Sequence, residues 1–125
     1  MATCAELTDQ KLNNNEGEDS YSILPLLLGQ ESSSDLREAT IHHSVNGIFA
    51  IRKGQWKFID AKGSGGWSLP EDKVAADAPP GQLYNMDKDP SEKTNLYTQH
   101  PEIVNELKAL LEKYKEQGHS RPMDK

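Results

Sequence analysis

The residues of this chain that could do chemistry are few and scattered. The histidines are His42, His43, His100 and His119, and the single cysteine is Cys4. A mononuclear metal site needs several His, Cys or carboxylate ligands at compatible spacings. His42 and His43 are adjacent in a predicted strand, so their side chains point to opposite faces and cannot easily chelate one ion together. His100 and His119 flank the last predicted helix and are a whole helix length apart. The sequence therefore predicts no metal site in this chain.

Nucleophilic catalysis has equally little support. A Cys–His pair would need a base beside Cys4, and nothing near Cys4 in the sequence supplies one. A lone cysteine among small and apolar residues is usually a core hydrophobe, which is what we expect of Cys4. Asp87 and Asp89 resemble part of a calcium loop, but the further oxygen ligands and the closing Glu are missing, so a turn is favoured. The motifs alone indicate no catalytic residue.

Whatever role these residues have, a small β-sheet is expected to position them. β-branched and aromatic residues are densest from residue 41 to residue 59. They predict a hairpin with arms at 47–52 and 55–60. Strand character also appears at 38–44, before the hairpin, and at 81–86. An isolated hairpin is marginal in water, so these further strands, or a helix, must cover an apolar face.

An amphipathic helix at the end of the chain is the clearest element. Pro101 opens it and Gly118 ends it, as the preferences of helix termini predict. One apolar stripe runs along it, formed by Ile103, Leu107, Leu110, Leu111 and Tyr114. This spacing is typical of a helix that packs on one face of a sheet. Two shorter helices are predicted near the start of the chain, over 1–12 and within 21–28.

A long segment without apolar periodicity joins the last two strands, from Asp60 to Pro80. Loops of this length in compact domains tend to be functional or disordered. Trp67 lies inside it and either anchors the loop to the core or stacks on a ligand; buried aromatics are commoner, so the sequence favours the anchor. A second flexible connection is predicted at 30–35.

The charge is distributed unevenly. The net charge of −6 comes entirely from residues 1–38, which carry two cations and eight anions. No basic patch exists to neutralise phosphates, so a nucleic-acid partner is not expected. No membrane partner is expected either, because the apolar run at 23–28 is far too short to span a bilayer. The first residues show no signal peptide. The composition places a boundary near residue 38.

Several motifs together resemble bacterial sulfatases of the arylsulfatase or N-acetylgalactosamine-6-sulfatase type. Two early segments, A-T-C-A-E-L-T at 2–8 and L-P-L-L-L-G at 24–29, resemble the late part of that family's catalytic domain. The segments H-H-S at 42–44, G-x-F-A-I-R-x-G-x-W-K at 47–57 and L-Y-N-M-x-K-D-P-S-E-x-x-N-L at 83–96 resemble its C-terminal region. Their order and spacing together are specific.

The resemblance implies an α+β fold, with a small antiparallel sheet of three to four strands packed by the C-terminal amphipathic helix. Residues 39–125 would form the C-terminal subdomain. Residues 1–38 would be a helical, loosely ordered remnant of the end of a larger α/β catalytic domain. The chain is thus expected to be a C-terminal fragment whose partner is the missing N-terminal catalytic domain. The resemblance implies that the parent enzyme is periplasmic or secreted.

The departure from the family pattern concerns the catalytic groups. Sulfatases use a formylglycine made from Cys or Ser within C-x-P-x-R, together with a calcium ion held by Asp and Asn residues. Cys4 is followed by Ala5-Glu6-Leu7 and is therefore not that residue. The resemblance implies calcium and formylglycine for the parent enzyme, neither of them in this fragment, and no catalytic residue here.

A share in substrate selection would remain. The resemblance places His42, His43 and Ser44 near the mouth of the active-site cleft. There an imidazole would bind a hydroxyl or sulfate of a sulfated carbohydrate or aryl sulfate. The alternative is that one histidine is buried and hydrogen-bonded and the other solvated. A different class of function is a free-standing α+β module that binds a carbohydrate or a protein through Trp67, Tyr84 and the hairpin face. The fragment predicts an exposed apolar patch; the module predicts order throughout and binding without added protein.

Overall fold

The structure is a computed structural model that describes residues 1–30 and 36–123. The chain divides into two compact units, Met1–Glu38 together with Tyr114–Lys125, and Ala39–Lys113. The predicted connection at 30–35 lies, apart from its first residue, outside the described residues. No helix among the described residues combines the length and the apolar character needed to cross a membrane.

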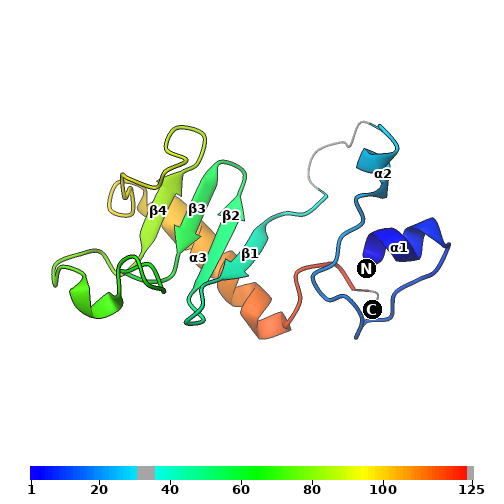
Figure 1. Cartoon of the computed structure of the whole chain (residues 1–125), viewed down its shortest axis with the longest axis horizontal. Helices are drawn as coiled ribbons and strands as arrows, with labels where there is room; N and C mark the ends of the chain where they lie inside the picture. The colour runs from blue at the N-terminus through cyan, green and yellow to red at the C-terminus, as the bar shows by residue number, and fades with distance from the viewer. Residues whose placement is uncertain (31–35, 124–125) are drawn as a thin grey trace. The chain divides into compact units, whose positions relative to one another are not determined.

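The larger unit is built on a four-stranded antiparallel sheet (Figure 1). Its strands are β1 (Thr40–His43), β2 (Phe49–Lys53), β3 (Trp56–Ile59) and β4 (Gln82–Asn85), and their order in the sheet follows the chain. The hairpin and both additional strands are confirmed, with slightly shorter bounds than expected. Together with the C-terminal helix, the sheet confirms the predicted α+β fold.

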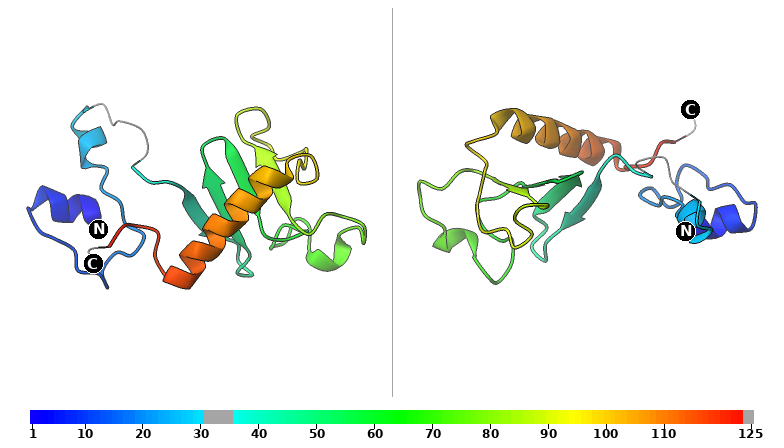
Figure 2. Two further views of the ribbon diagram at one scale, coloured as in Figure 1. Left: turned by 180° about the vertical axis from the view of Figure 1, so that it is seen from behind. Right: turned by 90° about the horizontal axis from the view of Figure 1, so that it is seen from above.

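One face of the sheet forms the core. The strand register aligns Ile51 with Phe58 and Phe58 with Leu83, and all three side chains are essentially inaccessible to solvent. Helix α3 (Pro101–Gln117) lies across this face (Figure 2). The helix contributes the buried side chains Val104, Leu107, Leu110 and Leu111. The predicted stripe is confirmed from Leu107 onward, but Val104, not the half-exposed Ile103, provides its first buried side chain.

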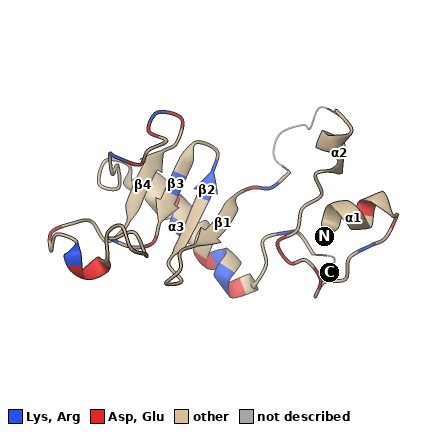
Figure 3. Cartoon of the chain, viewed as in Figure 1, with Lys and Arg blue, Asp and Glu red and all other residues tan. Residues whose placement is uncertain are grey.

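Special backbone positions set the ends of these elements. Gly54 has a φ of +55° in the two-residue connection between β2 and β3, a conformation that side chains with a Cβ rarely adopt. Pro101 is the first residue of α3, where its missing N–H costs no hydrogen bond. Gly118, with a φ of +71°, follows its last residue. Figure 3 shows charges of both signs along α3, as expected for the solvent side of an amphipathic helix.

The smaller unit contains α1 (Ala2–Leu7) and α2 (Leu24–Leu27), and neither helix has a buried residue. The predicted helix over 1–12 is wrong in length. It ends at Leu7 because the Thr8 hydroxyl donates to the Cys4 carbonyl at 2.9 Å and Asp9 adopts a φ of +54°. The expectation that Cys4 is a core hydrophobe is also wrong, since the side chain is exposed. Helix α1 has only six residues and none of them is buried, so it forms no core in which the Cys4 side chain could lie.

The C-terminal segment belongs to this smaller unit through polar contacts. The guanidinium of Arg121 donates to the carbonyl oxygens of Asn13 at 2.8 Å and Glu16 at 3.0 Å. The Tyr21 hydroxyl donates to the Ser120 carbonyl at 2.6 Å. Hydrogen bonds rather than an apolar core therefore connect the two ends of the chain within this unit.

Candidate functional site

The histidines predicted to bind substrate lie on β1, which is an edge strand of the sheet. His42 pairs with Ala50 and His43 with Phe49, so the two imidazoles belong to opposite faces. Both side chains reach solvent, and that of His42 is partly covered. Both imidazole rings therefore lie at the same end of β1, but they do not point toward a common ligand position.

His43 has a defined ring orientation. Its Nδ1 lies 2.9 Å from the Ser44 carbonyl oxygen, and its ring meets the Phe49 ring edge-on with centroids 5.9 Å apart. A carbonyl only accepts, so Nδ1 carries a proton and donates it there. The other nitrogen, Nε2, is then the one through which His43 can bind a ligand, as an acceptor when the ring is neutral and a donor when it is charged.

His42 lies on the outer face of the sheet, near an ion pair that the sequence did not reveal. The Lys57 ammonium contacts the Glu92 carboxylate at 2.6 Å, and both side chains are largely shielded from solvent. Partial burial, and then the positive charge of Lys57, lower the pKa of His42, while Glu92 partly offsets them. The imidazole of His42 is therefore kept neutral near pH 7, able to donate one hydrogen bond and accept another.

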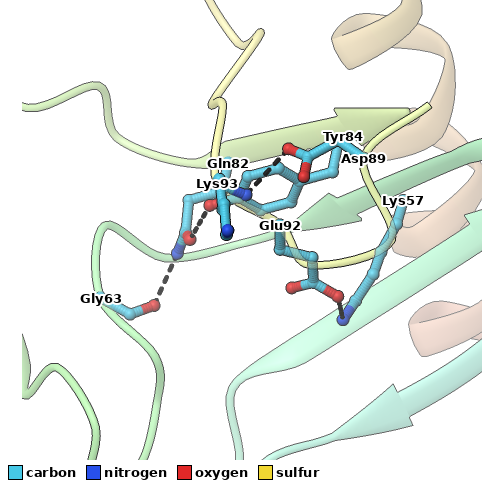
Figure 4. Close-up of polar contacts among 7 residues, drawn as sticks. All are labelled: Lys57, Gly63, Gln82, Tyr84, Asp89, Glu92 and Lys93. Carbon is cyan, nitrogen blue, oxygen red and sulfur yellow. Dashed lines mark hydrogen bonds and ion pairs between the residues drawn. The ribbon is translucent and has the colours of Figure 1, made fainter. Parts of the chain in front are cut away.

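A second polar group extends this outer face (Figure 4). The Tyr84 hydroxyl donates to Gln82 Oε1 at 2.7 Å, and Gln82 Nε2 donates to the Gly63 carbonyl at 2.6 Å. Burial, followed by the carboxylates of Glu92 and Asp89, raises the pKa of Tyr84, so its phenol stays protonated. These contacts tie β4 to the start of the long loop. Only Tyr84 among them was predicted to contribute to binding.

Ser44 begins the turn between β1 and β2, and its hydroxyl accepts a hydrogen bond from the Ile48 N–H at 3.2 Å. The Asn46 N–H donates to the Gly65 carbonyl at 3.3 Å, so the turn and the long loop lie side by side. In that loop the Trp67 side chain is 87% exposed. The prediction that Trp67 anchors the loop to the core is therefore wrong.

A hollow of about 420 Å³ lies at the start of β3, beside Trp56. Trp56 and His100 provide its aromatic side, with ring centroids 5.2 Å apart. The remaining lining residues are Gln55, Asn85, Lys88, Asp89, Thr94 and Leu96. Asp89 accepts hydrogen bonds at 2.8 Å from the backbone N–H groups of Lys93 and Thr94. Its carboxylate therefore organises a turn, as the sequence predicted.

The described residues do not fit the cofactors implied by the family resemblance. Across residues 1–30 and 36–123, no three His, Cys, Asp or Glu side chains come close enough to hold a metal ion. Cys4, an exposed residue of α1, has neither the proline nor the arginine of the formylglycine motif after it. No chemical step of sulfate hydrolysis can be assigned to these residues.

Comparison with known proteins identifies the family to which this fold belongs. A family described as the C-terminal region of aryl-sulfatase matches residues 35–123, and the chain belongs to that family. The curated N-acetylgalactosamine-6-O-sulfatase of Bacteroides thetaiotaomicron is 42% identical to it over 118 residues. That match covers 92% of this chain and 22% of the relative, so the chain spans about a fifth of the relative's length.

Solved structures agree with this assignment. A structure from work on the metabolism of multiple glycosaminoglycans by Bacteroides thetaiotaomicron matches with a TM-score of 0.71 at 37% identity. The match covers 91% of this chain and 23% of the other. Two structures of Ps i-CgsB, one in complex with k-i-k-neocarrahexaose, match with TM-scores of 0.58 and 0.57. They are 23% and 22% identical, cover 90% of this chain and 22% of theirs, and show the fold alone.

Proposed function

We propose that this chain is the C-terminal region of a longer sulfatase, a sulfuric ester hydrolase acting on a sulfated N-acetylgalactosamine unit. The observation that carries the proposal is the 42% identity to the N-acetylgalactosamine-6-O-sulfatase, which extends over 92% of the chain. The formylglycine and the calcium ligands would come from the remaining part of that enzyme. The chain by itself would not hydrolyse a sulfate ester.

Residues 1–38 would belong to the end of the catalytic domain. Three consecutive leucines at α2 and its end support this assignment: Leu26, Leu27 and Leu28 are 50%, 66% and 64% exposed. Contiguous exposed apolar side chains mark surfaces that another protein surface covers. The missing catalytic domain is the occupant we propose for them, and replacing one of these leucines by serine in the longer enzyme tests it.

The β1 end would contribute to substrate selection through His42, His43 and Ser44. The neutral imidazole of His42 suits a sugar hydroxyl, to which it can both donate and accept. The free Nε2 of His43 suits either a hydroxyl or, when protonated, a sulfate oxygen. Because the two rings belong to opposite faces, we propose that a given group of the substrate contacts only one of them. Ser44, whose hydroxyl receives the Ile48 N–H, holds the turn and has its own proton left to donate.

Separate replacements test this role in the longer enzyme. His42→Ala or His43→Ala is expected to lower kcat/KM for the sulfated sugar by about tenfold or more, since a hydrogen bond to a charged or strongly polar group is worth about 1.5–3 kcal/mol. Thr40→Ala is the matched control, because Thr40 is exposed on the same strand and shares the outer face with His42. Equal kcat/KM for all three variants and the unmodified enzyme would remove the β1 end from substrate selection.

A further inference from the structure

The side chain of Trp67 is an exposed indole. It is 87% accessible, and Val45 in the neighbouring turn is 66% accessible. An indole ring is among the largest apolar side chains, and leaving it in water gives up the stabilisation that burial would provide. Isolated exposed apolar residues are common, whereas neighbouring ones can form a binding surface. Val45 lies in the turn to which the loop of Trp67 is hydrogen-bonded.

The loop that carries Trp67 is held on both sides. The N–H of Ser64 donates to the Leu69 carbonyl at 2.8 Å, and the N–H of Leu69 donates back to the Ser64 hydroxyl at 3.0 Å. Just before this closure, the Gly63 N–H donates to the Glu71 carboxylate at 2.8 Å. Hydrogen bonds therefore hold the base of the loop, and the exposed indole of Trp67 lies between the bonded residues. A loop whose backbone is already held in the free chain loses less conformational entropy when a ligand binds than an unrestrained one.

The position of this loop connects it to the proposed substrate site. Gly65 lies against the turn that follows His43: a Cβ added to Gly65 would come within 2.5 Å of the Ser44 hydroxyl oxygen and 2.7 Å of the Ile48 Cβ. A Cβ added to Gly66 would lie 3.9 Å from Val45 Cγ1. Trp67 is therefore two residues from the point where the loop touches the turn at the end of β1, the strand with both histidines.

The chemistry around the indole favours a sugar ring over a charged group. Residues 64–69 are Ser-Gly-Gly-Trp-Ser-Leu and residues 44–48 are Ser-Val-Asn-Gly-Ile, so neither segment contains a charged side chain. Sugar rings present an apolar C–H face that stacks on indole, and their hydroxyls suit neighbouring Ser and Asn side chains. A sulfate group would find no cation in these segments. The sulfated ring itself is thus better placed at the β1 histidines.

We propose that Trp67 is a specificity-determining stacking platform for a sugar ring next to the sulfated one. The preferred substrate class is then a sulfated oligosaccharide or polysaccharide, and a monosaccharide sulfate or an aryl sulfate would be turned over without this contact. This inference rests on the proposed sulfatase function and adds a second substrate contact to it.

Intrinsic fluorescence of the chain tests the platform directly. The chain contains two tryptophans, and Trp56 is partly covered whereas Trp67 is exposed. Titration with a 6-sulfated glycosaminoglycan tetrasaccharide is expected to give a saturable change in emission. That change disappears in Trp67→Phe and persists in Trp56→Phe. A response that is absent, or that follows Trp56 alone, overturns the proposal.

Kinetics of the longer enzyme separate this inference from the proposed function. Trp67→Ala is expected to lower kcat/KM about tenfold on the tetrasaccharide, the loss that corresponds to exposing one ring face of apolar surface. It leaves kcat/KM on 6-sulfated N-acetylgalactosamine unchanged. Leu69→Ala, in the same loop and itself exposed, is the matched control and leaves both values unchanged.

The outcomes are distinguishable. Equal losses on the tetrasaccharide and the monosaccharide, or no loss on the tetrasaccharide, overturn the stacking role while the sulfatase function stands. An unmodified longer enzyme that releases no sulfate from either compound overturns the proposed function. In that case the fluorescence titration still decides whether Trp67 binds a sugar chain.

Discussion

The contact between the long loop and the β1–β2 turn provides the sharpest quantitative prediction. Gly65 has a φ of +62°, and a Cβ placed on it would lie 2.5 Å from Ser44 Oγ and 2.7 Å from Ile48 Cβ. A left-handed backbone costs a non-glycine residue about 1–2 kcal/mol, and overpacking costs about 1–3 kcal/mol. We therefore expect Gly65→Ala to lower the free energy of unfolding of the sheet unit by about 2–5 kcal/mol.

Two other glycines separate the backbone cost from the steric cost. Gly47 has a φ of +77° with nothing within 4 Å of an added Cβ, so Gly47→Ala measures the backbone term alone, about 1–2 kcal/mol. Gly66 lies outside the left-handed region and has its nearest neighbour at 3.9 Å, so Gly66→Ala is expected to change stability by less than about 0.5 kcal/mol.

Urea unfolding, followed by the fluorescence of Trp56 in β3, measures all three variants on the sheet unit. Hydrogen exchange of the Asn46 amide, which donates to the Gly65 carbonyl, reports whether the loop leaves the turn before the sheet unfolds. If Gly65→Ala costs no more than Gly47→Ala and the Asn46 amide exchanges as before, the loop does not pack on the turn. Trp67 then does not lie beside the end of β1, and its proposed contact with the neighbouring sugar ring is wrong as well.

The remaining predictions concern charge and docking. Lys57→Met is expected to raise the pKa of His42, because the charge of Lys57 lowers that pKa and the charge of Glu92 raises it. An NMR titration of His42 measures this pKa. Lys108→Met, on the solvent side of α3, is the control and should leave the pKa of His42 unchanged. The pKa of His42 in the folded chain is below its ordinary 6.5. The contribution of His42 to the free energy of unfolding is therefore complete above pH 6.5 and is lost as the pH falls through the lowered pKa of the folded chain. Urea midpoints measured at a series of pH values would contradict this dependence if they rose on acidification. Leu27→Ser is expected to lower the free energy of unfolding of the longer enzyme by about 1.5–3 kcal/mol. The same substitution is expected to lower that of the isolated chain by less than about 0.5 kcal/mol. Equal effects in both proteins would show that nothing covers α2.

Much of the fold could be predicted because its signals are local. The β-branched and aromatic residues of β2 and β3, with the glycine between them, specify the hairpin within a dozen or so neighbouring positions. The apolar period of α3 and its terminal Pro and Gly specify the helix in the same way. Helix α1 was overestimated because propensity alone cannot show that the chain turns at Thr8 and Asp9.

The candidate site depended on information that no local pattern contains. Sequence similarity pointed to His42 and His43, and their adjacency predicted opposite faces, which the register of β1 on β2 shows. The ion pair near His42 joins Lys57 to Glu92, residues 35 positions apart, and nothing in either neighbourhood predicts their meeting. The exposure of Trp67 was mispredicted because buried aromatics are the commoner case.

The sequence by itself determined the family, the strands, the long helix and the absence of a formylglycine motif, because each is written in contiguous or regularly spaced residues. Only the tertiary structure decided that Lys57 and Glu92 lower and partly restore the pKa of His42. Only it decided that the loop of Trp67 lies beside the end of β1. The physical reason is the same in both cases: charge interactions and burial depend on distances in space, and chain folding brings together residues whose separation in sequence carries no sign of their contact.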